Sequence, residues 1–539
     1  MNAPRRRDIV LLDRALLGVC LVLLGFAVLY PAIRLGITAV GSWEWDAVLT
    51  GAGFEATRNT IIIGFLSVFF AGIIGSGLAV LFTRYSFPGR AWLAAFAYLP
   101  FTLPPLVGVV SFYYLLGRDG FIARYADIHH GQEGWYLQGA SAIILIHAYS
   151  FYVFFYAMMS TALESMDVAQ IEAARTLGAG RWRVFHRVVL PMLKPALLGA
   201  ALLTFMTSGA SFSAPLIFGN DFPVLSVQIF QEDSQTNDGA ARTLTVILAL
   251  VSLMGVLLFR SRHASTGTAS KGVRVVVRAR AGRYLVTAVA ILIVGVLLIP
   301  HATIVWLSFM DYSEWDTEVI PNVPTLENYL GIFREADAFA PIRNSLWMSA
   351  LAALITVATA LPAGYLIARR RRGGRLVNFL VMIPWALPGT VIAVNLIVAF
   401  NDDWLPLVST VWILPLAYFI RNVPLLTRMT TAAIEPFDGQ LIEAGQTLGA
   451  SRWCCFAHII FPLLAPVIAS GAALVFAVSL GEFVASILLY GHDNVPIAVR
   501  IYELWRSGGT GMAFAYAVFL MLLVAVTFVM SRRFSSRLI

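Results

Sequence analysis

Long apolar segments separated by short polar ones run through almost the whole chain. A helix that crosses a membrane needs roughly 20 mostly apolar residues, and twelve segments of this sequence approach or exceed that length. The pattern therefore predicts an all-α polytopic membrane protein with about twelve transmembrane helices. The predicted spans lie near residues 11–33, 57–83, 91–116, 139–161, 196–218, 241–259, 284–308, 345–368, 376–400, 406–430, 467–490 and 511–531.

One polar interruption occurs twice in the sequence. Residues 163–195 and 434–466 align without a gap at a constant offset of 271 residues. An ungapped match of this length is hard to obtain by chance and indicates a duplicated unit. The offset pairs three residues of special chemistry: Glu172 with Glu443, Gly178 with Gly449, and Pro191 with Pro462.

The duplication divides the chain into two halves of six predicted spans each. We predict a first domain at 1–260 with a polar hairpin at 163–195, and a second domain at 284–539 with a hairpin at 434–466. The basic, small-residue segment 261–283 reads as a cytoplasmic linker between them. Because six is an even number, both halves enter the membrane in the same sense, as in other parallel repeats.

Charge and composition agree with a membrane location. The chain is 59% hydrophobic and 13% charged, whereas soluble proteins carry about 25% charged residues. Lysine and arginine gather in cytoplasmic loops of membrane proteins. Here the basic clusters at 5–7, 369–372 and 532–537 fall on one side of the predicted topology. Both termini and both polar hairpins are therefore expected in the cytoplasm.

The repeated segment has the signals of two short helices joined by a tight turn. Asp167 can cap the first helix, and Gly178 stands where a helix ends in a left-handed residue. A second helix is expected from Arg181 to Val189 and to stop before Pro191. In the second copy Asp438 is the cap and Gly449 the turn. An amphipathic loop lying on lipid headgroups is the alternative, but a repeated spacing favours a protein partner with two equivalent sockets.

These residues also carry a family resemblance. Glu172-Ala173-Ala174, Gly178 and Leu190-Pro191 match the EAA loop of ABC importer permeases. The second copy has Glu443-Ala444, Gly449 and Pro462, and departs from the pattern at Gly445 and Phe461. The whole chain thus resembles a fused pair of type I ABC importer permease domains.

The resemblance implies a mechanism and partners. In that family the hairpin contains a coupling helix that docks on a cytoplasmic ATPase subunit. Two copies of that ATPase and an external solute-binding protein are therefore expected, in a bacterial inner membrane, with alternating access to the solute. The chain has no G-x-x-x-x-G-K-[ST] phosphate loop. ATP hydrolysis, with its ATP and magnesium, is therefore expected on the partner, and this chain is expected to be no enzyme and to bind no cofactor. No nucleic-acid partner is expected, because the net charge of +8 fits basic cytoplasmic loops.

Fused permeases of this length resemble the ferric-iron, thiamine and phosphonate branch of the family. The segment 211–219 looks most like the ferric-iron members, so the expected solute is ferric iron. Thiamine, phosphonate and polyamine remain open as alternatives within this class. An ion-coupled secondary transporter is the alternative from another class, since such proteins also have parallel halves. A membrane enzyme is disfavoured, because no metalloprotease or nucleophile-elbow motif is present.

Polar residues within predicted spans are candidates for the substrate pathway. Glu482 is the clearest, and Ser211 is its counterpart at the repeat offset. Glu482 can also be read as a carboxylate paired with a nearby arginine. A lone His147 is more often a hydrogen-bonded core residue than a ligand. No metal site is assigned, because the external cluster at 127–133 has no closed-site spacing. The pathway candidates are Glu482, Ser208, Ser211, Ser213 and Asn395.

Overall fold

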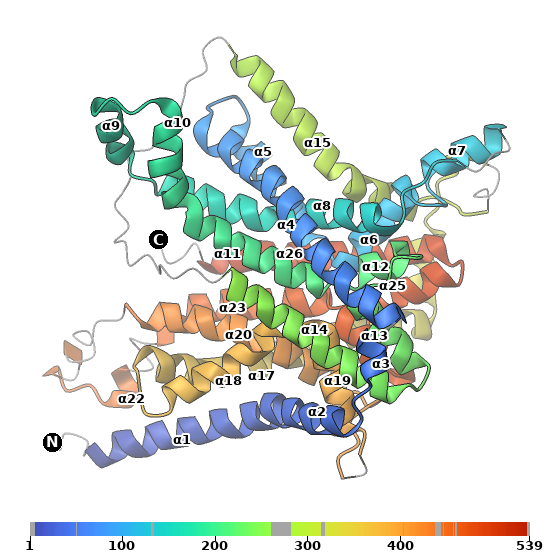
Figure 1. The fold of residues 1–539 in the computed structure, drawn as a ribbon. Helices are drawn as coiled ribbons and strands as arrows, with labels where there is room; N and C mark the ends of the chain where they lie inside the picture. The colour runs from blue at the N-terminus through green and yellow to red at the C-terminus, as the bar shows by residue number, and fades with distance from the viewer. Residues whose placement is uncertain are drawn as a thin grey trace. The chain divides into compact units, whose positions relative to one another are not determined.

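The computed structural model describes residues 6–535, except 50, 131–133, 260–281, 314–317, 403, 437–443, 446, 456–457 and 459–460. Most of the predicted linker lies outside these residues. Within them the regular elements are helices, and Met310 and Pro324 form an isolated bridge. The chain forms two compact units, Glu44–Thr325 and Met1–Trp43 with Leu326–Ile539. We call them the first-repeat unit and the second-repeat unit (Figure 1).

The first-repeat unit is a bundle around the long helices α4 and α8. These two helices pack against each other, and α11 packs against each of them. Its helices are α3 (Trp45–Leu49), α4 (Gly51–Arg84), α5 (Arg90–Phe96), η2 (Leu99–Thr102), α6 (Pro105–Leu116), α7 (Phe121–His130), α8 (Gly139–Glu164), α9 (Val168–Thr176), α10 (Arg181–Val184), η3 (Phe185–Val189), α11 (Leu190–Gly209), α12 (Ser213–Phe218), α13 (Leu225–Ser234), α14 (Asp238–Leu258) and α15 (Arg283–Ser308).

The second-repeat unit has the same plan around α17 and α20, with α23 packed against both. Its helices are α1 (Arg6–Leu24), η1 (Gly25–Leu29), α2 (Tyr30–Gly41), α16 (Glu327–Arg334), α17 (Ala336–Ala368), α18 (Gly374–Ala386), α19 (Gly389–Phe400), α20 (Ile413–Ile434), α22 (Arg452–Cys455), α23 (Phe461–Leu480), α24 (Val484–Leu489), η5 (His492–Asn494), α25 (Ile497–Arg506) and α26 (Thr510–Ser535).

The compact units differ from the sequence halves by an exchange of first spans. The amino-terminal α1 and α2 pack on α17, α18 and α19 of the second repeat. Cys20 and Leu24 share a buried cluster with Phe400, and ion pairs join Arg34 to Asp402 and Arg371 to Asp13. In the same way α15, the first span of the second repeat, packs on α5 and α6. Each unit therefore takes one helix from the other repeat.

About twelve spans are expected from the sequence. Ten of the described helices are long and apolar enough to cross a membrane, or eleven if α18 and α19 form one bent span. The predicted span 406–430 corresponds to α20, which is long enough, with 22 residues, but is not among the ten. Arg421, Asn422, Arg428 and three threonines reduce its apolar character.

Four predicted spans are broken into shorter helices. Residues 91–116 form α5, η2 and α6, and residues 376–400 form α18 and α19, which meet at 111°. Residues 196–218 are divided between α11 and α12, and residues 467–490 between α23 and α24. The last two breaks, at 210–212 and 481–483, occupy equivalent positions in the two repeats and contain Ser211 and Glu482.

Candidate functional site

The first repeated hairpin is built from local signals that the sequence contains. The Asp167 side chain accepts a hydrogen bond from the Ala169 N–H at 3.0 Å and so caps α9. At the other end Gly178 has φ +79°, and the Ala179 N–H donates to the Ala174 carbonyl at 3.0 Å. This is a left-handed helix end of the kind that favours glycine. The predicted cap and turn are confirmed.

The second hairpin repeats the turn. Gly449 has φ +86°, and the Ala450 N–H donates to the Gly445 carbonyl at 3.0 Å. Ala444 and Pro462 are exposed. The predicted residues Asp438 and Glu443 lie outside the described residues.

The predicted stop before Pro191 is wrong. The chain runs on without interruption from α10 through the π-helical turn η3 into α11. In that turn the Leu190 N–H donates to the Phe185 carbonyl five residues back. A π turn changes the hydrogen-bond register just where proline cannot donate, so the helix passes Pro191 intact. The same arrangement, η1 followed by Pro31, carries α1 into α2.

Both hairpins present a leucine to the surroundings at the same repeat position. Leu177 is 88% exposed and Leu448 is 89% exposed, and their numbers differ by the repeat offset of 271. Trp182 adds a further exposed apolar side chain beside the first hairpin. Figure 1 shows α9 and α10 projecting beyond the ends of α8 and α11. The exposed coupling candidates of the first copy are Glu172, Ala173, Gly178 and Pro191, with Ala174 and Asp167 partly buried.

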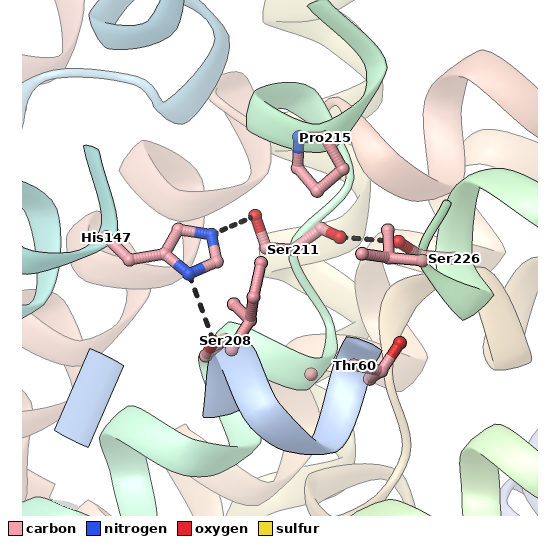
Figure 2. A pocket seen from close by; sticks show the side chains of 9 residues that line it. Thr60, His147, Ser208, Ser211, Pro215 and Ser226 are labelled. Carbon is pink, nitrogen blue, oxygen red and sulfur yellow. Dashed lines mark hydrogen bonds between the residues drawn. The ribbon is translucent and has the colours of Figure 1, made fainter. Parts of the chain in front are cut away.

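A neutral polar cluster surrounds the helix break of the first repeat. The His147 ring on α8 lies between three serine hydroxyls: Nδ1 is 2.9 Å from Ser67 Oγ and 3.0 Å from Ser208 Oγ, and Nε2 is 2.8 Å from Ser211 Oγ. Ser226 donates to the Ser211 carbonyl. Figure 2 shows His147, Ser208, Ser211 and Ser226 around a small pocket that Thr60 also lines. His147 is thus a hydrogen-bonded core residue.

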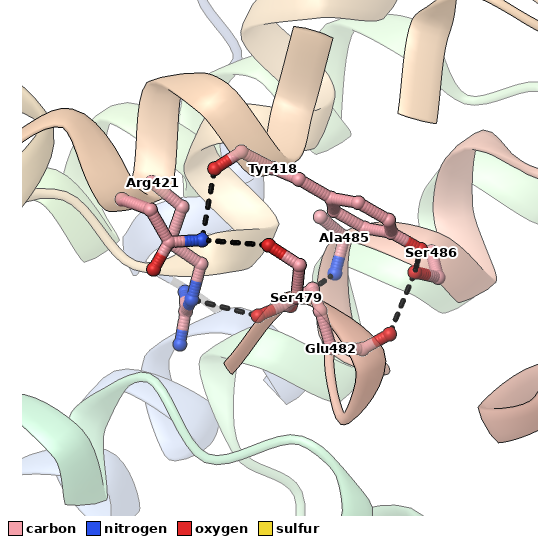
Figure 3. Close-up of polar contacts among 7 residues, drawn as sticks. Tyr418, Arg421, Ser479, Glu482, Ala485 and Ser486 are labelled. Atoms are coloured by element: carbon pink, nitrogen blue, oxygen red, sulfur yellow. Dashed lines mark hydrogen bonds and ion pairs between the residues drawn. The ribbon is translucent and has the colours of Figure 1, made fainter. Parts of the chain in front are cut away.

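An ion pair occupies the equivalent break in the second repeat. Arg421 Nε on α20 lies 2.7 Å from Glu482 Oε2, and Glu482 Oε1 accepts the Ala485 N–H at 3.0 Å. Tyr418, which stands at the repeat position of His147, is hydrogen-bonded to Ser486 at 2.8 Å. Figure 3 shows this network across α20, α23 and α24. Glu482 therefore both pairs with an arginine and accepts an N–H from the first turn of α24.

The predicted pathway residues fall into two groups. Ser208 and Ser211 meet around His147, and Ser213 is buried at the start of α12. Glu482 and Asn395 are buried in the second-repeat unit. Among the described residues Asn395 Oδ1 has no hydrogen-bond partner. Sequence reasoning missed Arg421, although an arginine inside a predicted span was a visible signal.

The comparisons agree with this architecture. The chain matches the family described as "Binding-protein-dependent transport system inner membrane component" over residues 69–264 and 360–539. It is 29% identical over 542 residues to the "Probable ABC transporter permease protein y4fN" of Sinorhizobium fredii, covering 95% of both chains. It is 26% identical over 548 residues to the "Ferric transport system permease protein FbpB" of Actinobacillus pleuropneumoniae, covering 95% of this chain and 77% of that one.

A solved structure also matches one half of the chain. It is titled "Crystal structure of bacterial alginate ABC transporter in complex with alginate pentasaccharide-bound periplasmic protein". The match has 19% identity and a TM-score of 0.38, and covers 48% of this chain and 95% of that one.

The paired domains and hairpins define a membrane permease subunit of the ABC importer class. The protein belongs to the binding-protein-dependent transport system inner membrane component family, as a fused chain that carries the domain twice. It is accordingly a multi-pass membrane protein.

Proposed function

We propose that the chain carries ferric iron inward, driven by two copies of a cytoplasmic ABC ATPase that dock on the two hairpins. The observation that carries the ATPase proposal is the pair of leucines, Leu177 and Leu448, exposed on matching turns. A single exposed leucine is ordinary, but the same leucine exposed to the same extent at the same turn of both repeats fits a partner that binds both hairpins in the same way. Two equivalent exposed leucines, one on each hairpin, fit two copies of the same partner.

In this proposal ATP and magnesium belong to the ATPase, and an external solute-binding protein delivers the cargo. Both termini and both hairpins lie in the cytoplasm. Binding of ATP at the hairpins and of the loaded binding protein outside shifts the permease between inward- and outward-open states. Such a shift needs each partner to bind one state more tightly than the other.

The iron proposal rests on the ferric permease relative, which aligns along nearly the whole of this chain. Uptake of radioactive iron tests it. Cells that produce the chain with its neighbouring ATPase and binding protein should accumulate ⁵⁵Fe in an ATP-dependent way. Uptake of thiamine, a phosphonate or a polyamine in place of iron would transfer the proposal to that solute, and uptake driven by a proton gradient without ATP would refute the ATPase proposal.

We place the cargo path along the polar helix breaks, with Glu482 and Ser211 as contact residues. A carboxylate within a membrane span is usually functional. Glu482→Gln should lower uptake while the chain still assembles with its ATPase. Wild-type uptake by this variant would remove Glu482 from the path.

A further inference from the structure

Arg421 lies near the middle of α20, which corresponds to the predicted span 406–430, and yet its side chain is partly exposed. Helix α20 begins directly after Trp412, which is 57% exposed, and tryptophan gathers at membrane interfaces. At 1.5 Å per residue, Arg421 lies about 13 Å further along the helix. Its side chain is 32% exposed. A guanidinium facing lipid at this depth is costly, so the exposed part faces water or a ligand.

The guanidinium has donor capacity left over. Arginine has five N–H donors, and among the described residues Glu482 is the only acceptor that Arg421 contacts, through Nε. Glu482 in turn divides its two oxygens between Arg421 and the Ala485 N–H. The two Nη groups of Arg421 can therefore donate to a further acceptor, whereas both oxygens of the Glu482 carboxylate already accept hydrogen bonds.

The surroundings of Arg421 are electropositive despite the ion pair. A Cβ atom on Gly389 would lie 2.9 Å from Arg421 Nη1, so the guanidinium sits against the first turn of α19, a helix of 12 residues. The start of such a helix carries about half a positive charge. Arg428, two turns further along α20, is exposed on the same face. One carboxylate cannot neutralise all three groups.

We infer that Arg421 and the first turn of α19 form a binding subsite for an anionic oxygen group, a carboxylate or an oxyanion, for which Glu482 stands in until the ligand arrives. This subsite rests on the proposed import function, because its ligand is the cargo or a part of it. A bare trivalent cation would be repelled by Arg421. A metal cargo would therefore cross with anionic oxygen ligands attached.

The first repeat has no such subsite at the equivalent described position. The repeat offset places Ser150 of α8 at the position of Arg421, and Ser150 is likewise half-buried. At the break, Ser211 replaces Glu482. In the first repeat, uncharged serines therefore occupy the positions of Arg421 and Glu482, so that repeat serves as an internal control.

Anion-dependent thermal unfolding of the purified full-length chain tests the subsite. The probes are sulfate, citrate and ferric citrate, each compared with chloride at equal ionic strength. In the wild type, sulfate and citrate should raise the unfolding temperature in a saturable way. Glu482→Gln should bind them at least about tenfold more tightly, because the internal competitor is gone and charge-assisted bonds are strong. Arg421→Gln should lose the response.

Two further variants keep the test decisive. The double variant Arg421→Gln with Glu482→Gln leaves no buried charge unpaired, so its loss of the anion response would not reflect misfolding. Ser150→Gln is the matched control and should respond as the wild type does. A wild-type response in the double variant, or unchanged affinity in Glu482→Gln, would overturn the inference.

The ferric citrate arm distinguishes the two sources of the anion. Tighter binding of ferric citrate than of citrate identifies the anion as a metal ligand, and equal or weaker binding identifies it as cargo by itself. None of these measurements needs the ATPase. Loss of the subsite with intact ATP-driven iron uptake would defeat only this inference, and loss of uptake with an intact anion response would defeat the proposed function.

Discussion

The two repeats are alike at their exposed hairpins and unlike at their buried helix breaks. Leu177 and Leu448 are almost equally exposed, on turns whose glycines have nearly the same φ. At the breaks, by contrast, one repeat has a neutral His147–serine cluster and the other has an Arg421–Glu482 ion pair at the equivalent position. The two hairpin turns thus share the same exposed leucine and glycine geometry, whereas the two helix breaks contain different polar groups.

This difference follows from what each region must bind. A partner that docks on both hairpins requires the same exposed leucine and the same glycine turn in both repeats. A cargo that crosses once requires no internal symmetry, so each break is constrained only by its own polar partners. On this account, symmetric variants should have symmetric effects at the hairpins and unequal effects at the breaks.

The largest expected effect comes from placing charge on both hairpins. Leu177→Asp combined with Leu448→Asp should abolish ATP-driven uptake, because an anchor residue of an interface contributes about 2 kcal/mol or more. Each single variant should show the same partial loss. Leu326→Asp, an exposed leucine outside the hairpins, is the control and should leave uptake unchanged. Clearly different uptake by the two single variants would show that the two hairpins are not equivalent.

The second effect is loss of stability at the charged break. Arg421→Gln leaves Glu482 buried without its cation and should destabilise the chain by about 3–5 kcal/mol, the usual result of breaking a buried pair. Thermal unfolding in detergent measures it. The double variant with Glu482→Gln should recover most of this loss. If the single and double variants were equally unstable, the ion pair would not be the cause.

A smaller effect is expected at the neutral break. His147→Phe deprives Ser67, Ser208 and Ser211 of their shared partner and should cost about 1–3 kcal/mol. Tyr418→Phe, at the equivalent position, removes one hydrogen bond to Ser486 and should cost about 1 kcal/mol. Thermal unfolding of the His147→Phe and Tyr418→Phe variants shows which of the two polar clusters contributes more stability. A costlier Tyr418 variant would reverse the ranking.

A modest effect on stability, with a specific effect on coupling, is expected at the turn glycines. A β-branched residue in the left-handed region is disfavoured by about 1–2 kcal/mol, so Gly178→Val should distort the turn without unfolding the chain. ATP hydrolysis per iron imported should rise, and Gly449→Val should behave alike. An unchanged ratio in both variants would show that the turn shape does not transmit coupling.

Much of this arrangement was predictable because it depends on local signals. Apolar length located most spans, and a capping Asp167 followed by Gly178 specified the hairpin. The helix end at Pro191 was mispredicted because a π turn, which leaves no mark in composition, accommodates the proline. The exchange of α1 and α15 was not predictable either, since packing partners far apart in sequence decide it.

The candidate site was predictable only in part. Glu482 and Ser211 were visible as polar residues within apolar runs, and their equivalence followed from the repeat offset. The helix breaks at these residues were missed, because an apolar run has the same composition whether it is continuous or broken. The role of Arg421 could not be predicted from the sequence, because it depends on the packing of α20 beside the start of α19.

The number of ATPase subunits bound per permease tests the central claim most directly. Native mass spectrometry of the purified complex should find two ATPase copies on the wild-type chain and one on either Leu177→Asp or Leu448→Asp. Two copies retained on either single variant, or one copy on the wild type, would contradict the proposal that the two hairpins are equivalent docking sites.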